Sequence, residues 1–192
     1  EGLLESVFPT RCAGCDLPGT LLCDSCRDSL VRVAEEWACP QCGAPYGFIV
    51  CTECWETEFA FEAAVAVGTL ERPLSRVVTL YKDGGERRLS TPLAALLAAR
   101  VEPWRGWAHA VVAVPATTRA VRDRGFDHMA RVAGELAARL DAPALVALGA
   151  RGARDLRALS REERRREVHG AFEVRPRVRV PPRVLLVDDV LT

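Results

Sequence analysis

The sequence predicts an α/β protein in which a small cysteine-rich module precedes a larger domain with a parallel sheet. All eight cysteines lie in C-x-x-C pairs before residue 55. The rest of the chain alternates short apolar runs with amphipathic segments at helical spacing, a pattern typical of a parallel sheet covered by helices. We therefore expect a zinc module over residues 1–57 and an α/β domain over residues 58–192.

The cysteines form four pairs of identical spacing. Disulfide frameworks do not usually confine every cysteine to one spacing, and four tandem pairs outside a βαβ context do not indicate a redox motif. A tight C-x-x-C turn lets two thiolates bind one tetrahedral zinc ion at about 2.3 Å. The pairs, which are the predicted zinc ligands, are Cys12/Cys15, Cys23/Cys26, Cys39/Cys42 and Cys51/Cys54.

The cysteine module is an internal duplication. The stretch "CAGCDLPGTLLCDSC" is followed by "CPQCGAPYGFIVCTEC", and each holds two pairs around a turn with proline and glycine. The economical interpretation is two consecutive four-cysteine sites, Cys12 to Cys26 and Cys39 to Cys54. A pairing of the first with the third pair and of the second with the fourth stays open. Four sulfurs fill a tetrahedral ion, so the sequence predicts two structural zinc sites.

Charge is unevenly distributed although the formal net charge is zero. Residues 1–57 carry nine acidic and three basic side chains, which would repel a phosphate backbone and favour protein docking. Residues 151–183 carry eleven arginines against five acids. Within this stretch Ser160 and Glu163 form a capping-box pattern that predicts a helix start.

We expect a cytoplasmic protein without a membrane span. No apolar run approaches the roughly 20 residues that cross a bilayer. The first residues have neither the basic flank nor the apolar core of a secretory signal.

The larger domain is expected to contain the following elements in chain order. Apolar runs predict strands over 61–70, 109–115, 142–148, 171–174 and 183–189. Helical spacing predicts helices over 72–85, 86–101 and 124–140, with Pro92 marking a break or a first turn in the second of them.

Two of these strands end in residues suited to a ligand, and parallel sheets bind ligands beyond the carboxyl ends of their strands. Arg119, Arg122 and Arg124 follow one strand and precede a helix, and guanidinium groups match phosphate geometry. Asp188 and Asp189 follow another, and carboxylates suit hydroxyls or a hard cation. A phosphorylated ribose would satisfy both. The histidines His109, His128 and His169 are interpreted as structural or surface groups.

The motifs and their order resemble a known family. "VLLVDDVLT" resembles the phosphoribosyl-pyrophosphate (PRPP) motif of type I phosphoribosyltransferases. The four cysteine pairs, then "YKDGG", "VVAVPATTRAVRDRGF", "LSREERRREVHGAF" and "VLLVDDVLT", resemble the ComF, or competence-protein, family over nearly the whole chain. That family joins a double zinc ribbon to a phosphoribosyltransferase-like domain.

The resemblance implies roles for individual residues. Asp188 and Asp189 would be catalytic and would bind the ribose hydroxyls directly or through Mg²⁺, and residues 151–170 would be a mobile loop. The reaction would be displacement of pyrophosphate from PRPP by a base. The other PRPP-binding residues would be Val190, Leu191 and Thr192 on the 5′-phosphate side, and Pro115, Ala116, Arg119, Arg122 and Arg124 on the pyrophosphate side.

The resemblance also implies a part in DNA uptake during natural competence, with protein partners in that machinery. The family continues with T-G-x-T after Thr192, so we expect this chain to be a fragment. It departs from the family in "RGFDH", where R-G-F-N-Q is usual, and at Glu167, where asparagine is common. Two alternatives therefore stay open: a PRPP-binding adaptor without catalysis, and an accessory protein that contacts single-stranded DNA through Arg164, Arg165 and Arg166.

Overall fold

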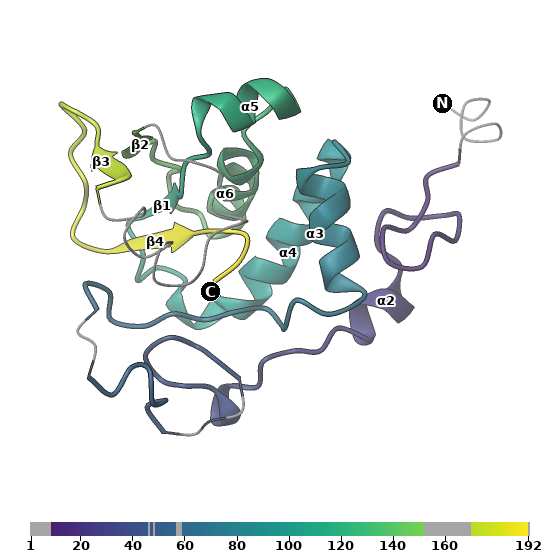
Figure 1. Ribbon diagram of the computed structural model, residues 1–192, viewed down its shortest axis with the longest axis horizontal. Helices are drawn as coiled ribbons and strands as arrows, with labels where there is room; N and C mark the ends of the chain where they lie inside the picture. The colour runs from purple at the N-terminus through teal and green to yellow at the C-terminus, as the bar shows by residue number, and fades with distance from the viewer. Residues whose placement is uncertain (1–8, 46, 48, 57–58, 152–169, 192) are drawn as a thin grey trace. The chain divides into compact units, whose positions relative to one another are not determined.

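The computed structural model describes residues 9–45, 47, 49–56, 59–151 and 170–191 (Figure 1). It is a mixed helix and strand structure that divides into two compact units. One comprises residues 1–92, 99–103 and 190–192, and the other comprises residues 93–98 and 104–189. The predicted domain boundary at residue 57 stays a prediction. No helix in these described stretches has both the length and the apolarity that crossing a bilayer requires.

The first unit holds the cysteine ribbons and short helices: α2 (Asp24–Asp28), η1 (Glu35–Trp37), α3 (Leu74–Lys82) and η2 (Arg87–Leu89). Helix α3 confirms the prediction over 72–85. Its apolar residues Leu74, Val77 and Tyr81 recur at helical spacing and are buried. Helix α4 (Ser90–Arg100) follows η2, and Pro92 stands in its first turn. Proline is tolerated there because the first helical N–H groups have no intrahelical acceptor.

The strand expected over 61–70 is wrong. Only Gly68 forms an isolated bridge, to Arg32. The backbone N–H groups of this run bond elsewhere: Ala64 donates to Gln41 O at 2.8 Å and Thr69 donates to Val31 O at 2.9 Å. An apolar run alone does not make a strand, because a strand also needs a neighbouring strand with which to form a ladder.

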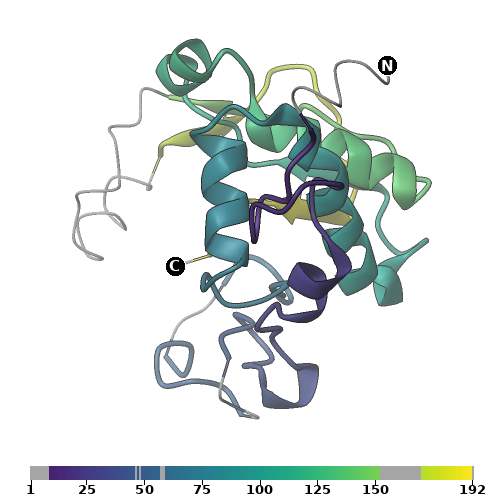
Figure 2. The same cartoon turned by 90° about the vertical axis from the view of Figure 1, so that its right-hand side faces the viewer.

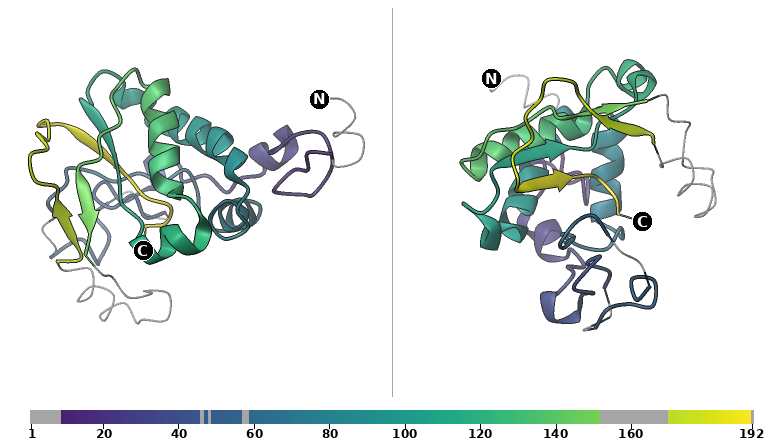
Figure 3. Two further views of the ribbon diagram at one scale, coloured as in Figure 1. Left: turned by 90° about the horizontal axis from the view of Figure 1, so that it is seen from above. Right: turned by 90° about the vertical axis from the view of Figure 1, so that its left-hand side faces the viewer.

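The second unit is built on a two-stranded parallel sheet (Figure 3). Strands β1 (Ala110–Ala113) and β4 (Val184–Val187) pair in parallel, with Ala110 opposite Val184 and Ala113 opposite Val187. The short helix η3 (Glu102–Trp104) comes before β1 in the chain. The other elements of the second unit are α5 (Thr118–Arg124), α6 (His128–Arg139), β2 (Leu148–Ala150) and β3 (Phe172–Val174).

Helix α6 covers β1 and closes the core of this unit. Asp127 caps the helix by accepting a hydrogen bond from Ala130 N at 3.0 Å, which satisfies a donor left free at the first turn. The apolar face predicted for this helix is confirmed, and Val111 of β1 is fully buried. The buried residues on that face are Met129, Val132, Ala133, Leu136 and Ala137.

The strand expected over 142–148 is only partly present. Ala144 forms a parallel bridge with Val111 on the side of β1 away from β4, supported by Val111 N donating to Pro143 O at 2.9 Å. Farther on, β2 pairs with β3 in antiparallel fashion, so the sheet content is not purely parallel as predicted. The chain returns from β2 to lie beside it as β3, and the ladder is extended where Arg151 N donates to Ala171 O at 2.8 Å.

Candidate functional site

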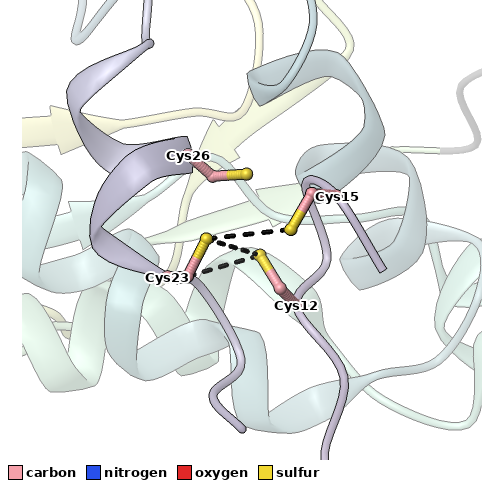
Figure 4. Close-up of side chains that lie close together, drawn as sticks. All are labelled: Cys12, Cys15, Cys23 and Cys26. Atoms are coloured by element: carbon pink, nitrogen blue, oxygen red, sulfur yellow. Dashed lines mark hydrogen bonds between the residues drawn. The ribbon is translucent and has the colours of Figure 1, made fainter. Parts of the chain in front are cut away.

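Four cysteines of the first ribbon point their sulfur atoms toward a common centre (Figure 4). The Sγ atoms of Cys12, Cys15, Cys23 and Cys26 all lie within 4.8 Å of one another. Cys23 Sγ is 3.6 Å from Cys12 Sγ and 3.8 Å from Cys15 Sγ. A tetrahedral ion with zinc–sulfur bonds of about 2.3 Å separates its ligands by about 3.8 Å. The cluster therefore has the dimensions of a four-thiolate zinc site.

The second ribbon repeats this arrangement with Cys39, Cys42, Cys51 and Cys54, again within 4.8 Å of one another. Cys42 Sγ and Cys51 Sγ are 3.8 Å apart. The structure thus groups the cysteines consecutively, and the interleaved pairing is not the one found. Each cluster supplies four sulfur ligands, which fills a tetrahedral ion and suits a structural role.

The duplication seen in the sequence extends to backbone geometry. Cys23 N donates to Cys12 Sγ at 3.3 Å, and Cys51 N donates to Cys39 Sγ at 3.4 Å. These bonds hold the second pair of each ribbon against the first sulfur. Both ribbons therefore use one local design to bring two cysteine pairs together.

Each ribbon also turns sharply just after its first cysteine pair. Asp16 and Gly43 occupy this position and have φ angles of 67° and 69°. The first is a residue type that tolerates the left-handed region, and the second has no Cβ to strain there. A Cβ on Gly43 would also lie 2.5 Å from Ala64 O, so the segment after the ribbons passes directly over this turn.

The first cysteine of each cluster ionises more readily than an ordinary thiol. Burial acts to raise the pKa of Cys12, but the N–H groups of Cys23, Cys15 and Gly14 outweigh it and lower the pKa to about 6. Burial also acts to raise the pKa of Cys39, but hydrogen bonds from backbone N–H groups outweigh it and lower the pKa to about 6.

The last cysteine of each cluster behaves in the opposite way. Burial, followed by hydrogen bonds among neighbouring thiols, raises the pKa of Cys26 to about 12 and also raises the pKa of Cys54. A bound cation would hold all four sulfurs as thiolates, because a coordinating thiol is deprotonated.

Arg76 lies on α3, and its guanidinium braces the first cysteine turn. Figure 2 shows this helix beside the first ribbon, which is drawn in dark purple. Its Nη1 donates to Ala13 O at 2.7 Å and to Cys12 O at 3.4 Å. Its Nη2 lies 3.3 Å from Asp16 Oδ1. The pKa of the Asp16 carboxyl is lowered mainly by the hydrogen bond from Arg76. The positive charge of Arg11 lowers it further. Arg76 thus fixes both carbonyl and carboxylate groups around the first cluster.

The second candidate site lies at the carboxyl edge of the parallel sheet. Because β1 and β4 run in the same direction, their last residues leave the sheet side by side, and Val114 N donates to Val187 O at 2.9 Å. Pro115 and Ala116 follow β1, and Asp188 and Asp189 follow β4. The structure therefore brings these two predicted groups of residues to one edge.

Asp189 is joined to the helices beside this edge through His128. His128 Nε2 lies 3.1 Å from Asp189 Oδ2, and its Nδ1 lies 3.4 Å from Nη1 of Arg124. The side chains of His128 and Asp189 are only 6% and 14% exposed. In contrast, Asp188 is exposed, and its Oδ1 accepts a hydrogen bond from Asp189 N at 2.8 Å.

The three predicted phosphate-binding arginines lie on α5 and not in a loop before a helix. Thr117 caps α5 by accepting from Ala120 N at 3.1 Å, so the helix begins earlier than expected. Arg119 is 91% exposed and lies 3.7 Å from Asp123, and Arg122 is also exposed. Arg124 is linked to Asp189 through the ring of His128.

The prediction for the remaining residues stays a prediction. Val190 and Leu191 follow Asp189 in the chain and are assigned to the first unit. Thr192, and residues 152–169 of the arginine-rich stretch, lie outside the described residues.

Sequence reasoning missed His128, which was interpreted as a structural or surface group. A signal was present in the sequence. His128 directly follows the helix cap Asp127 and stands four residues after Arg124, at the position where the resembled family carries glutamine. A histidine that follows a helix cap and stands four residues after an arginine has polar groups near it along the chain.

Comparisons with protein-family models, with curated proteins and with solved structures found no match for this chain. The resemblance to the ComF family therefore rests on the motifs and their order.

Proposed function

We propose that this protein binds PRPP or ribose phosphate together with Mg²⁺ in a phosphoribosyltransferase-like domain. We further propose that it carries two structural zinc ions and serves DNA uptake in the manner of ComF proteins. The main support for ribose-phosphate binding is that Asp188 and Asp189 lie at the same edge of a parallel sheet as the segment that begins at Pro115. Ligands of such sheets bind beyond the carboxyl ends of the strands.

The chemistry of the edge suits a phosphorylated sugar. Asp188 is exposed just beyond β4 and could accept hydrogen bonds from ribose hydroxyls. Helix α5 presents Arg119 and Arg122 to solvent on the side of β1, where they could pair with phosphate oxygens. Carboxylates near the ribose would also favour the positive charge that develops on the sugar as pyrophosphate departs.

Two adjacent carboxylates fit a hard cation, which prefers oxygen ligands. Asp188 and Asp189 would hold Mg²⁺ with the ligand, and the cation would neutralise charge on the pyrophosphate. The chain itself supplies the acceptor oxygens and the arginines.

Zinc is proposed for both cysteine clusters because sulfur separations of 3.6 and 3.8 Å match a tetrahedral thiolate site. Elemental analysis of the purified protein should give two zinc ions per chain. Replacing Cys12 and Cys15 with serine should remove one ion, and replacing Cys39 and Cys42 should remove the other. A metal-free folded protein would refute this part of the proposal.

The ribose-phosphate site is tested by calorimetric titration of zinc-loaded protein with PRPP and Mg²⁺. We expect a Kd in the micromolar range that is lost in Asp188→Asn. Asp141→Asn is the matched control, because Asp141 is an exposed aspartate paired with Arg105 at 3.1 Å. No binding by the wild-type protein would refute the proposal.

Turnover separates an enzyme from an adaptor. Release of pyrophosphate with one of the common nucleobases would establish phosphoribosyl transfer. Tight binding without release would favour the adaptor, which keeps the ligand site without the reaction.

A further inference from the structure

We infer that His128 is a positioning residue for Asp189 and that it divides the roles of the two neighbouring aspartates. Asp189 is the carboxylate held by the protein, and Asp188 is the carboxylate presented to the ligand. This inference rests on the proposed function, because it names how that ribose-phosphate site is ordered.

The geometry around His128 fixes Asp189 in place. His128 is the first residue of α6 and is 5% exposed, and its Nε2 lies 3.1 Å from Asp189 Oδ2 at the end of β4. The contact joins residues 61 positions apart in the chain. A buried hydrogen bond between a helix start and a strand end restricts the rotation of the Asp189 side chain.

The partners of the two ring nitrogens determine where the proton lies. A guanidinium has donors and no acceptor, so the Nδ1 that faces Arg124 at 3.4 Å must accept. The ring proton is then on Nε2, which donates to Asp189 Oδ2. His128 thereby holds Oδ2 of Asp189 in one direction.

Asp188 differs in both burial and contacts. Its side chain is exposed, and its Oδ1 accepts from the backbone N–H of Asp189. Holding Asp189 therefore also sets the direction in which Asp188 leaves the strand. The two aspartates of "VDDV" therefore differ in exposure and in hydrogen-bond partners once the chain is folded.

Arg124 extends the same chain of contacts to α5. It belongs to the arginine group proposed for the pyrophosphate, and its guanidinium reaches Asp189 through His128. The His128 ring consequently connects the phosphate half of the proposed site with its ribose half.

Two substitutions of His128 test the inference. His128→Leu keeps much of the side-chain volume and removes both ring nitrogens, whereas His128→Gln restores an N–H donor at a similar reach. His109→Gln is the matched control, since His109 also contacts an arginine, Arg183 at 3.2 Å, but at the start of the same strands. Thermal unfolding and zinc content should first show that each variant folds.

We expect His128→Leu to weaken binding of PRPP with Mg²⁺ by about tenfold or more, the usual effect of removing a group that orients a ligand-binding side chain. His128→Gln should bind within about threefold of wild type, a fraction of that effect, and His109→Gln should bind as wild type. Wild-type affinity in His128→Leu, or equal losses in the leucine and glutamine variants, would overturn the inference.

A second measurement separates this inference from the proposed function. NMR of the imidazole N–H groups should show a protected Nε2–H signal that is absent in His128→Gln. Asp189→Asn should shift that signal far more than Asp188→Asn does. If the wild type binds no PRPP, the proposed function fails, and this signal alone decides whether His128 orders Asp189. The same signal decides the matter if His128→Leu does not fold, and its absence from the wild type would overturn the inference.

Discussion

One methyl group at residue 14 should weaken zinc binding at the first cluster and leave the second cluster unchanged. A Cβ on Gly14 would lie 2.5 Å from Cys26 Sγ and 3.1 Å from Pro73 Cβ. Ordinary contacts between such atoms need about 3.5 Å or more. Gly14→Ala must therefore displace the Cys26 sulfur, or the turn that carries Gly14, by about 1 Å.

Zinc–thiolate geometry does not absorb such a shift. Ligand distances in zinc sites vary by only about 0.2 Å. Moving the turn instead would loosen the bond from Gly14 N to Cys12 Sγ, which is 3.4 Å long. Overpacking of this kind costs about 1–3 kcal/mol, which corresponds to zinc affinity about 5- to 150-fold weaker.

Competition with a coloured zinc chelator measures this effect. The wild type should release both ions at high chelator concentration, whereas Gly14→Ala should release one of its two ions earlier. Gly47→Ala is the matched control in the second ribbon, because a Cβ there would lie 3.6 Å from Ile49 O, an ordinary contact. Unchanged release of both ions from Gly14→Ala would refute the close approach of Gly14 to Cys26.

Three further outcomes are expected. Arg76→Ala should weaken zinc binding at the first site alone, by about 1 kcal/mol per lost hydrogen bond, in the same chelator assay. Equal weakening of zinc binding at both sites would contradict this expectation. Gly43→Ala should weaken zinc binding at the second site alone, because φ of Gly43 is 69° and a Cβ there would lie 2.5 Å from Ala64 O. Wild-type zinc affinity at the second site would contradict the turn geometry at Gly43. Asp127→Ala should destabilise the protein by about 1 kcal/mol through loss of the α6 cap, measured by urea unfolding, with Asp127→Asn close to wild type.

Local patterns in the sequence were sufficient where the structure depends on neighbours along the chain. The four C-x-x-C pairs predicted both clusters, because ligands of one zinc site lie within one short ribbon. Helices α3 and α6 could be predicted from apolar residues at helical spacing. Backbone hydrogen bonds of a helix are local, so its sequence contains most of the information needed.

Sequence patterns failed where pairing partners lie far apart. The run over 61–70 is largely apolar, but Ala64 N and Thr69 N bond to Gln41 O and Val31 O, and no strand forms there. The stretch over 142–148 was expected to be one strand, but it meets β1 only near Ala144 before β2 turns to pair with β3. A strand is defined by its neighbour, which a one-dimensional pattern does not identify.

The sequence by itself determined the residue types at the proposed ligand edge and the four cysteine pairs, since both are contained in short motifs. Only the tertiary structure decided that Asp188 is exposed while Asp189 is held by His128, a residue 61 positions away. It also decided that Arg76 braces the first ribbon from a helix more than 60 positions beyond Cys12. Both contacts arise because packing of α6 against β1, and of α3 near the ribbon, brings distant polar groups within hydrogen-bonding distance.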